Sequence, residues 1–516
     1  MSHHTAPAPV PGAAHGTRHG HGHHGQPAAH PHGAHHPHPA HHEAGEAEAR
    51  RPWTVLALML MAQFMVVLDV SVVNVALPSI GKSLSFSSGD YQWVVSAYVL
   101  LSGGLLLFGG RLSDLFDRRT MFLTGLTTFT IASLVSATAS SAATMIMSRA
   151  AQGTGAAMLT PAALSIIVTT YTGKQRSTAL AIWGTIGSMG IAAGVLLGGI
   201  LTTTLGWRSI FFVNVPIGIV AAVLTLRTVA RSRSNGHTHG QRSLDVPGAI
   251  TLVTGLLAMV YAIESAGTHG WTSTQTIAGS TVATVLLTAF WLIERHVPAP
   301  LVPPATWKIR SLMSASTVMA VITGAIVGAI FVSSLFLQQV LGASPVVAGL
   351  EFLPLAAAIT LGAAVASHVI GHVGPKHLMV VGLLVVATGA WLLAGMDANP
   401  SYLTDVLPGF IVLGLGTGPM FVAISIVAMG GISHEQSGLA SGVMMTGHEV
   451  GAALGVASLT AIAGDLTTRT GLIDAYPTVF TAIAVAMVAL SAFAAFAVPS
   501  VKGPAGGGHG HGHGMH

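Results

Sequence analysis

The chain has no cysteine and very few charged residues. Without cysteine it has no disulfides, no thiolate metal sites and no cysteine nucleophile. Asp, Glu, Lys and Arg make up 7% of the 516 residues, whereas a soluble domain carries about 25%. This shortage excludes a soluble enzyme and a disordered chain, and a formal net charge of only +4 excludes a nucleic-acid-binding surface. With 51% hydrophobic residues and a mean hydropathy of +0.69, the composition indicates a membrane protein.

Histidine is the residue in excess, and it is concentrated in two tails. Of 27 histidines, fourteen lie in the first 42 residues and four in the last eight. Residues 1–50 consist mainly of His, Ala, Pro and Gly and contain no apolar run or secretory signal, and 501–516 are Gly-His-rich, so we expect both tails to be disordered. The histidines have no fixed ligand spacing, so no defined metal site is expected. Weak binding of divalent metal by the tails remains open, beside tails that are dispensable.

The region between the tails predicts an all-α polytopic membrane protein. Between Trp53 and Pro499 the sequence contains fourteen mostly apolar stretches, each near the roughly 20 residues that a spanning helix needs. If the N-terminus is cytoplasmic, 17 of the 21 Lys and Arg residues fall on the cytoplasmic side, and only Lys82, Arg208 and Arg469 fall outside. Because basic residues favour the cytoplasmic side, this asymmetry predicts that both termini are cytoplasmic.

Weak internal repeats suggest two related halves. Gly153-Thr154-Gly155 recurs as Gly416-Thr417-Gly418, 263 residues later, and the start of the following helix recurs with an offset of 260. Such agreement in spacing is typical of a duplicated transporter unit. We therefore expect six-helix bundles at residues 51–235 and 308–500, with two inserted helices at 240–298.

Charged residues inside spans are costly and usually functional. Asp69 is 16 residues into its helix, about 24 Å at 1.5 Å per residue, and Arg149 is about 7 residues, roughly 10 Å, into a helix that enters from outside. Both are therefore expected in the outer half of the membrane. There they either pair and gate proton access, or form a static ion pair.

His448 and Glu449 are expected near the membrane midplane, about 18–20 Å into their helix. A buried carboxyl group and an imidazole can each carry a transported proton. Adjacent residues point about 100° apart on a helix, so at most one of them faces the transport pathway squarely. Otherwise they hydrogen-bond to polar neighbours between helices, whereas Glu264 and Glu351 are expected at the membrane interface.

Four motifs occur in order along the chain: Leu68–Pro78 (LDVSVVNVALP), Gly110–Arg119 (GRLSDLFDRR), Arg149–Gly155 (RAAQGTG) and Trp207–Pro216 (WRSIFFVNVP). The second and third resemble the G-x-L-x-D-R-x-G-R-R and R-x-x-Q-G-x-G patterns of the major facilitator superfamily. The first resembles the L-D-x-T-x-V-N-V-A-L-P pattern of its fourteen-helix group, and the fourth also resembles that group. The chain is specifically similar to the superfamily's fourteen-helix drug–proton antiporter group. The resemblance covers about residues 53–499 and implies the two-bundle fold of that superfamily.

The resemblance assigns a role to the cytoplasmic loop motif. It implies a conformational latch for the outward-open state, formed by Gly110, Asp114, Arg118 and Arg119. The alternative is ordinary anchoring by basic residues at the membrane surface. The family's first Arg and second Gly are here Leu115 and Asp117.

A glycine series in the fifth span matches the family's G-x-x-x-G-P-x-x-G-G motif at Gly190, Gly194, Gly198 and Gly199, with Val195 in place of the proline. Glycines four residues apart share a helix face and let another helix approach closely. In the resembled family this face lies between the halves. The series either packs helices tightly or also limits proton leak. Because the missing proline is associated with antiport, its absence leaves open a coupling other than proton exchange.

These observations lead us to expect proton-coupled efflux of drugs or other small amphipathic organic compounds by alternating access in a bacterial cytoplasmic membrane. The expected partners are the lipid bilayer, a small-molecule substrate and protons, with no nucleic acid, no cofactor and no catalytic residue. The chain has no G-x-x-x-x-G-K-[ST] motif, so ATP is not expected as the direct energy source. Two alternatives remain: an exporter of a specific native metabolite or a metal complex, with metal on the tails, and a non-transporting membrane sensor of pH or metal.

Overall fold

A computed structural model describes residues 52–229, 245–298, 300–396, 400–430, 432 and 437–500. The two histidine-rich tails lie outside the described residues. Every regular element in the described ranges is a helix. A helix suits an apolar segment in a membrane, because it satisfies its backbone N–H and C=O groups within the same segment.

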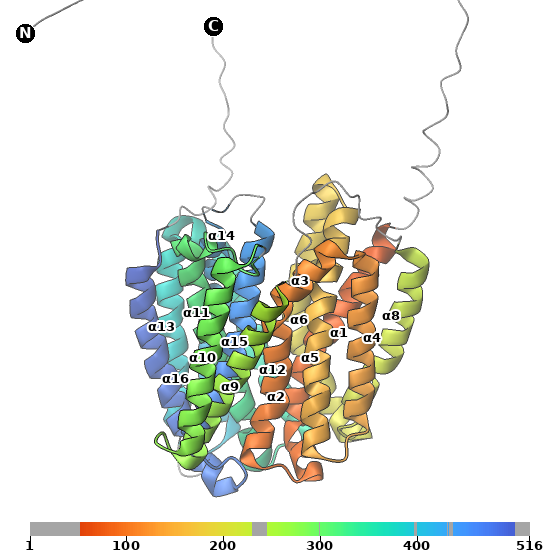
Figure 1. The fold of residues 1–516 in the computed structure, drawn as a ribbon. Coiled ribbons are helices and arrows are strands. Elements are labelled where there is room, and N and C mark those ends of the chain that lie inside the picture. Colours follow the sequence, from red (N-terminus) through yellow and green to blue (C-terminus); the bar gives the residue numbers. More distant parts are fainter. Residues whose placement is uncertain are drawn as a thin grey trace, which may run out of the picture. The chain divides into compact units, whose positions relative to one another are not determined.

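The helices follow one another with short connections (Figure 1). The first group is α1 (Pro52–Leu84), α2 (Ser88–Gly104), α3 (Leu106–Leu115), α4 (Arg118–Ala137), α5 (Ala142–Thr170), α6 (Gly173–Leu205), α7 (Ser209–Phe212) and α8 (Asn214–Thr228). A hairpin of α9 (Val246–His269) and α10 (Thr274–His296) comes next. The last group is η1 (Thr306–Lys308), α11 (Arg310–Gln339), α12 (Pro345–Val373), α13 (Pro375–Ala394), η2 (Tyr402–Val406), α14 (Leu407–Met429), α15 (Ser437–Ala463) and α16 (Arg469–Ala497).

Polar residues at the helix ends set where the spans begin. Ser87 and Asp90 form a capping box at α2, in which the Ser87 backbone N–H donates to the Asp90 carboxylate at 2.8 Å. Asp117, which replaces a glycine of the resembled loop motif, caps α4 by accepting from the Thr120 backbone N–H at 3.0 Å. The substitution therefore has a local structural role.

Eleven helices in the described ranges are long and apolar enough to cross a membrane, and a twelfth span is counted if α2 and α3 are one helix bent by 41° at Leu105. The further long helices α6 and α15 have 33 and 27 residues. The count is therefore compatible with the fourteen predicted spans. The bend was not predicted, because the apolar run continues through it without a proline.

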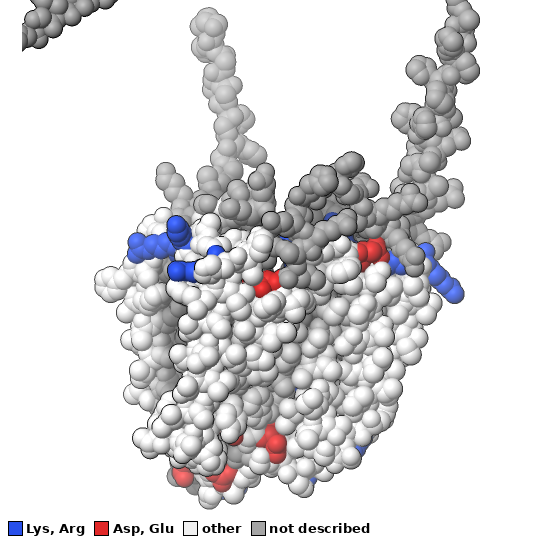
Figure 2. Space-filling model, viewed as in Figure 1, with Lys and Arg blue, Asp and Glu red and all other residues white. Residues whose placement is uncertain are grey.

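The helices alternate in direction, which defines two ends of the bundle. The tail end holds the first residue of α1 and the last of α16, and the far end holds the loops at 85–87, 270–273 and 464–468. Most of the visible Lys and Arg atoms gather at the tail end, at the top of Figure 2, and acidic atoms are visible at both ends.

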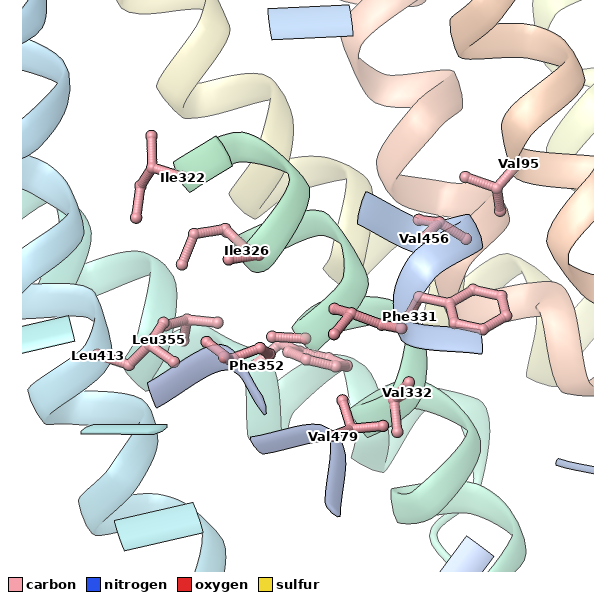
Figure 3. Packing of buried hydrophobic residues seen from close by; sticks show 14 of the residues in the cluster. Val95, Ile322, Ile326, Phe331, Val332, Phe352, Leu355, Leu413, Val456 and Val479 are labelled. Atoms are coloured by element: carbon pink, nitrogen blue, oxygen red, sulfur yellow. The ribbon is translucent and has the colours of Figure 1, made fainter. Parts of the chain in front are cut away.

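The two helix groups meet along specific pairs. Helix α6 packs on α12, α2 packs on α15, and α1 packs on α11, while the hairpin helix α9 lies against both α2 and α15. One large apolar cluster includes Leu77 and Trp207 from the first group and Phe336 and Tyr476 from the last. Figure 3 shows Val95, Phe331 and Val456 from three helices in this cluster. Lipid is as apolar as these side chains, so moving them out of lipid brings no hydrophobic gain. Close van der Waals packing therefore stabilises this contact.

Hydrogen bonds also connect the two groups toward the far end. Ser334 on α11 donates to the backbone carbonyl of Asn74 at 2.6 Å, and Gln338 donates to that of Val75 at 2.8 Å. The Val346 N–H donates to the Thr203 hydroxyl at 3.2 Å. Direct polar contacts between α1 and α11 and between α6 and α12 therefore join the two groups toward the far end.

Candidate functional site

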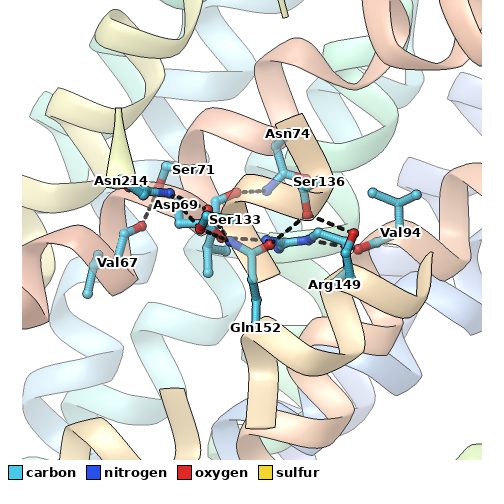
Figure 4. A network of polar contacts seen from close by, with 12 residues as sticks. Val67, Asp69, Ser71, Asn74, Val94, Ser133, Ser136, Arg149, Gln152 and Asn214 are labelled. Atoms are coloured by element: carbon cyan, nitrogen blue, oxygen red, sulfur yellow. Dashed lines mark hydrogen bonds and ion pairs between the residues drawn. The ribbon is translucent and has the colours of Figure 1, made fainter. Parts of the chain in front are cut away.

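The predicted charged residues Asp69 and Arg149 form a buried ion pair. Asp69 lies on α1 and Arg149 on α5, and each residue is 1% exposed. The Arg149 Nη1 donates to the Asp69 Oδ2 in a close contact (Figure 4). Both residues were placed at similar depth from the sequence, and the structure brings them together.

Two neutral amides complete the surroundings of the Asp69 carboxylate. Gln152 and Asn214 each donate from the side-chain nitrogen to Asp69 Oδ1, at 3.1 Å in both cases. Ser133 on α4 accepts from the same two amides, at 2.6 Å from Gln152 and 3.3 Å from Asn214. The carboxylate therefore accepts three hydrogen bonds, from residues on α5 and α8, at the centre of the first helix group.

Arg149 has further partners that offset its burial. Its Nη1 donates to Gln152 Oε1 at 2.8 Å, and its Nε donates to the backbone carbonyl of Val94 at 3.3 Å. The guanidinium carbon lies 4.3 Å from the ring centroid of Tyr98 on α2, which is a cation–π distance. An isolated charge is very costly in an apolar interior, so the pair and its surroundings persist only as a unit.

The network has spare hydrogen-bonding capacity. The hydroxyl of the buried Tyr98, Asn74 Oδ1 and Asn214 Oδ1 have no hydrogen-bond partner among the described residues. Five helices, α1, α2, α4, α5 and α8, contribute to the site.

Glu449 lies where the two helix groups meet. Its Oε2 accepts a hydrogen bond from the Ser102 hydroxyl on α2 at 3.1 Å. Helices α2 and α15 approach so closely here that a Cβ atom at Gly103 would overlap the Glu449 Cβ. The carboxylate is therefore placed at a contact that must change if the groups move relative to one another.

His448 lies beside Glu449 and near α14. Its Nδ1 lies 3.4 Å from Glu449 Oε1, and its ring is 6.4 Å from that of Phe421 on α14. The side chains of His448 and Glu449 are 34% and 21% exposed, so both are more accessible than the Asp69–Arg149 pair. Tyr98 and Ser102 are one turn apart on α2, and this segment connects the ion pair with Glu449.

The loop predicted as a latch is only partly described. Arg119 Nη2 donates to the backbone carbonyl of Leu226 at the end of α8, at 2.8 Å. Gly110 on α3 has open space nearby, because an added Cβ would meet only Pro161, at 3.9 Å. The Nε of Arg118 has no hydrogen-bond partner among the described residues, and the side chain of Asp114 lies outside them. The Arg119 hydrogen bond joins α4 to α8 within the first helix group, and the latch stays a prediction.

The four motif glycines of α6 do not all face the same neighbour. Cβ atoms at Gly190 and Gly194 would lie 2.6 Å from Val67 and Ser71, and one at Gly198 would lie 2.9 Å from Val72, all on α1. Only Gly199 faces α12, across the contact between the two helix groups. The expected position between the halves therefore holds for Gly199, whereas the other three let α1 and α6 pack closely within the first group.

Sequence reasoning missed Gln152, Asn214, Tyr98 and Ser102. Gln152 and Asn214 both lie inside the quoted motifs, so a polar residue at a fixed motif position was the available signal. Asn214 is also the first residue of α8, after a break at Val213 that the apolar run does not reveal. Within the described ranges, no group of three potential metal ligands occurs.

Comparison with known proteins agrees with this architecture. The profile of the Major Facilitator Superfamily matches residues 59–456. The puromycin resistance protein pur8 of Streptomyces alboniger is 38% identical over 416 residues, covering 80% of this chain and 82% of that protein. The cephamycin export protein CmcT of Amycolatopsis lactamdurans is 35% identical over 443 residues, covering 85% and 91% of the two chains.

The fold is also shared with solved transporters. A bacterial homologue of the human lysosomal transporter Spinster, in an inward-facing and unoccupied conformation, superposes with a TM-score of 0.63 at 18% identity. The match covers 87% of this chain and 97% of that one. The matched span, the identity to the two curated relatives and the helical architecture agree, and the chain belongs to the major facilitator superfamily.

Proposed function

We propose that this transporter exports small amphipathic organic compounds from a bacterial cell in exchange for protons. The observation that carries the proposal is the Asp69–Arg149 pair, a carboxylate and a guanidinium buried together within membrane-spanning helices. Such groups are expensive in a membrane and usually serve a transported ion or substrate. The relatives named for puromycin resistance and cephamycin export support an organic cargo.

The geometry suggests how a proton changes the protein. A proton on Asp69 cancels the charge that pairs with Arg149, which then keeps only Gln152, the Val94 carbonyl and the Tyr98 ring. The energetic reason to hold α1 against α5 is then weakened. Because backbone carbonyls of α1 accept hydrogen bonds from Ser334 and Gln338, a shift of α1 bears directly on closure of the far end.

Glu449 is the second proposed coupling residue. Its hydrogen bond to Ser102 joins α15 to α2, and protonation removes the negative charge that strengthens this bond. His448 is a proposed proton or substrate contact beside it. Exchange then needs no covalent chemistry, because protonation and substrate binding bias the same contact between the two helix groups.

The orientation is part of the proposal. The tail end carries most basic residues and is assigned to the cytoplasm, which leaves both termini cytoplasmic and the far end outside. The Asp114, Arg118 and Arg119 loop is then a cytoplasmic latch, and Gly199 with its neighbours forms part of the moving contact between α6 and α12.

Efflux from cells that lack their own exporters tests this function. A panel of organic cations, neutral antibiotics and puromycin is followed with and without a protonophore. We expect several compounds to be exported, each only while the proton gradient is present. Export that continues unchanged with the protonophore contradicts proton coupling.

A narrower candidate is an exporter of one native metabolite, as the names of single-antibiotic relatives suggest. The same panel separates the two candidates. Export of one compound alone, with the others retained in the cell, supports the narrow candidate. Resistance that requires zinc and is lost when residues 1–50 are removed supports a metal complex as the cargo.

A further inference from the structure

A cavity lined in part by polar side chains lies at the far end of the bundle, away from the Asp69 and Glu449 sites. It has a volume of about 310 Å³ and lies between α2, α9 and α15, with Gln92, Glu264, Thr460 and Asp465 among its lining residues. These helices come from three separate parts of the chain, so the cavity exists only when the inserted hairpin and the two helix groups are assembled.

Gln92 is the residue that indicates a missing ligand. It is 0% exposed, lines the cavity, and has no hydrogen-bond partner for either its side-chain nitrogen or its oxygen among the described residues. A buried amide without partners is strongly disfavoured, because it has lost its water without gaining other hydrogen bonds. An occupant with N–H donors satisfies the Gln92 oxygen.

The charge of the lining is negative. Glu264 and Asp465 line the cavity, and no Lys or Arg does. Asp465 accepts hydrogen bonds from the Thr467 and Thr468 hydroxyls, both at 2.6 Å, and these bonds hold the pKa of its carboxyl below its usual range. Asp465 therefore stays ionised at neutral pH and attracts cations.

Glycines fix the shape of the cavity. A Cβ atom at Gly89 would lie 2.9 Å from Glu264 Oε1, and one at Gly267 would lie 2.6 Å from the Cα of Ala461. A residue larger than glycine at position 89 would therefore push the Glu264 carboxylate away, and one at position 267 would push α9 away from α15. The wall of the cavity next to Glu264 is thus formed by close helix contacts on two sides.

We propose that this cavity binds a small organic ammonium ion on the outer face of the transporter. The Glu264 carboxylate pairs with the ammonium group, the Gln92 oxygen accepts one of its N–H bonds, and Asp465 adds long-range attraction. The described residues offer no trio of metal ligands, so an organic cation fits the donor set better than a metal ion. The role of the cavity as an exit site for cationic cargo rests on the proposed function, but binding itself does not.

Equilibrium binding to the full chain in lipid nanodiscs tests the site, at one pH and without a gradient. The probe is n-pentylammonium, and n-pentanol is its uncharged counterpart. Glu264→Gln removes the paired charge, and Gln92→Leu removes the amide at similar volume. Asp474→Asn is the matched control, because it removes an exposed carboxylate at the same end of the bundle.

We expect wild type and Asp474→Asn to bind n-pentylammonium with equal affinity, and the affinity to fall at least tenfold in Glu264→Gln and in Gln92→Leu. n-Pentanol, which carries no charge, is expected to lose less affinity than n-pentylammonium in Glu264→Gln. Equal affinity in all four proteins, or no binding to wild type, overturns the site. Because the assay needs no transport, loss of efflux with binding intact contradicts the proposed function and leaves the site standing.

Discussion

Replacing Asp69 by Asn tests whether the buried pair acts as a unit. The change keeps the shape of the side chain and keeps Oδ1 as an acceptor for Gln152 and Asn214. The atom that then faces the Arg149 guanidinium, in place of the charged Oδ2, is uncharged. The guanidinium then remains buried without an anion.

The expected cost follows from burial. Removing one partner of a buried ion pair costs about 3–5 kcal/mol, because the other charge is left uncompensated. The remaining contacts of Arg149 are neutral and recover only part of this. At about 2 °C per kcal/mol, the low end of the range for large domains, the midpoint of thermal unfolding drops by roughly 6–10 °C.

A double-mutant cycle isolates the pair. Arg149→Met removes the partner charge with a side chain of similar length, and a neutral replacement of a whole buried pair is often close to neutral in stability. Asp69→Asn with Arg149→Met is therefore expected to be more stable than either single variant. Thermal unfolding of the purified proteins in detergent measures all four members of the cycle, with Asp474→Asn as a surface control.

The result that refutes this reasoning is additivity. If the double variant loses the sum of the two single losses within about 0.5 kcal/mol, the two side chains do not interact energetically. A single variant as stable as wild type also refutes it, because the buried charge would then have found other compensation.

Three further predictions concern other parts of the chain. Glu449→Gln is expected to weaken protonophore-sensitive efflux in cells while the protein still reaches the membrane, and protonophore-sensitive efflux at the wild-type rate rules Glu449 out as a coupling residue. Gly198→Leu is expected to destabilise the protein by about 1–3 kcal/mol through overpacking against α1, whereas Gly371→Leu, which has open space around it, is expected to be neutral in the same thermal assay. The pKa of Asp465 is lowered from its usual 3.8, so its ionised form stabilises the fold above pH 3.8, and this contribution is lost as pH falls through the lowered pKa. Asp465→Asn should therefore lower the stability of the fold at pH 7 and have little effect on it in strong acid. An equal loss of stability at both pH values contradicts this.

The ion pair was predictable because both of its members are charged residues in apolar runs. Counting residues along two antiparallel helices placed Asp69 and Arg149 at similar depth, and burial of a charge demands a partner. Gln152 and Asn214 escaped this reasoning because neutral amides are tolerated in membrane helices. Only the folded arrangement shows that both donate to the same carboxylate oxygen.

The direction of each helix face was harder to predict than its composition. Spacing alone places Gly190, Gly194 and Gly198 on one face of α6, but it does not say whether that face meets α1 or another group of helices. The breaks at Leu105 and Val213 were missed for a related reason. The sequence is apolar on both sides of each bend, so the hydropathy profile does not reveal the bend.

Transport by the purified protein in liposomes tests the central claim most directly. Ethidium carries a permanent charge, so it does not accumulate in an acidic lumen by protonation alone. With an acidic lumen, proton–substrate exchange predicts ethidium uptake that is collapsed by a protonophore and is absent with Asp69→Asn and in protein-free liposomes. Uptake that is the same with and without the pH gradient contradicts proton-coupled exchange.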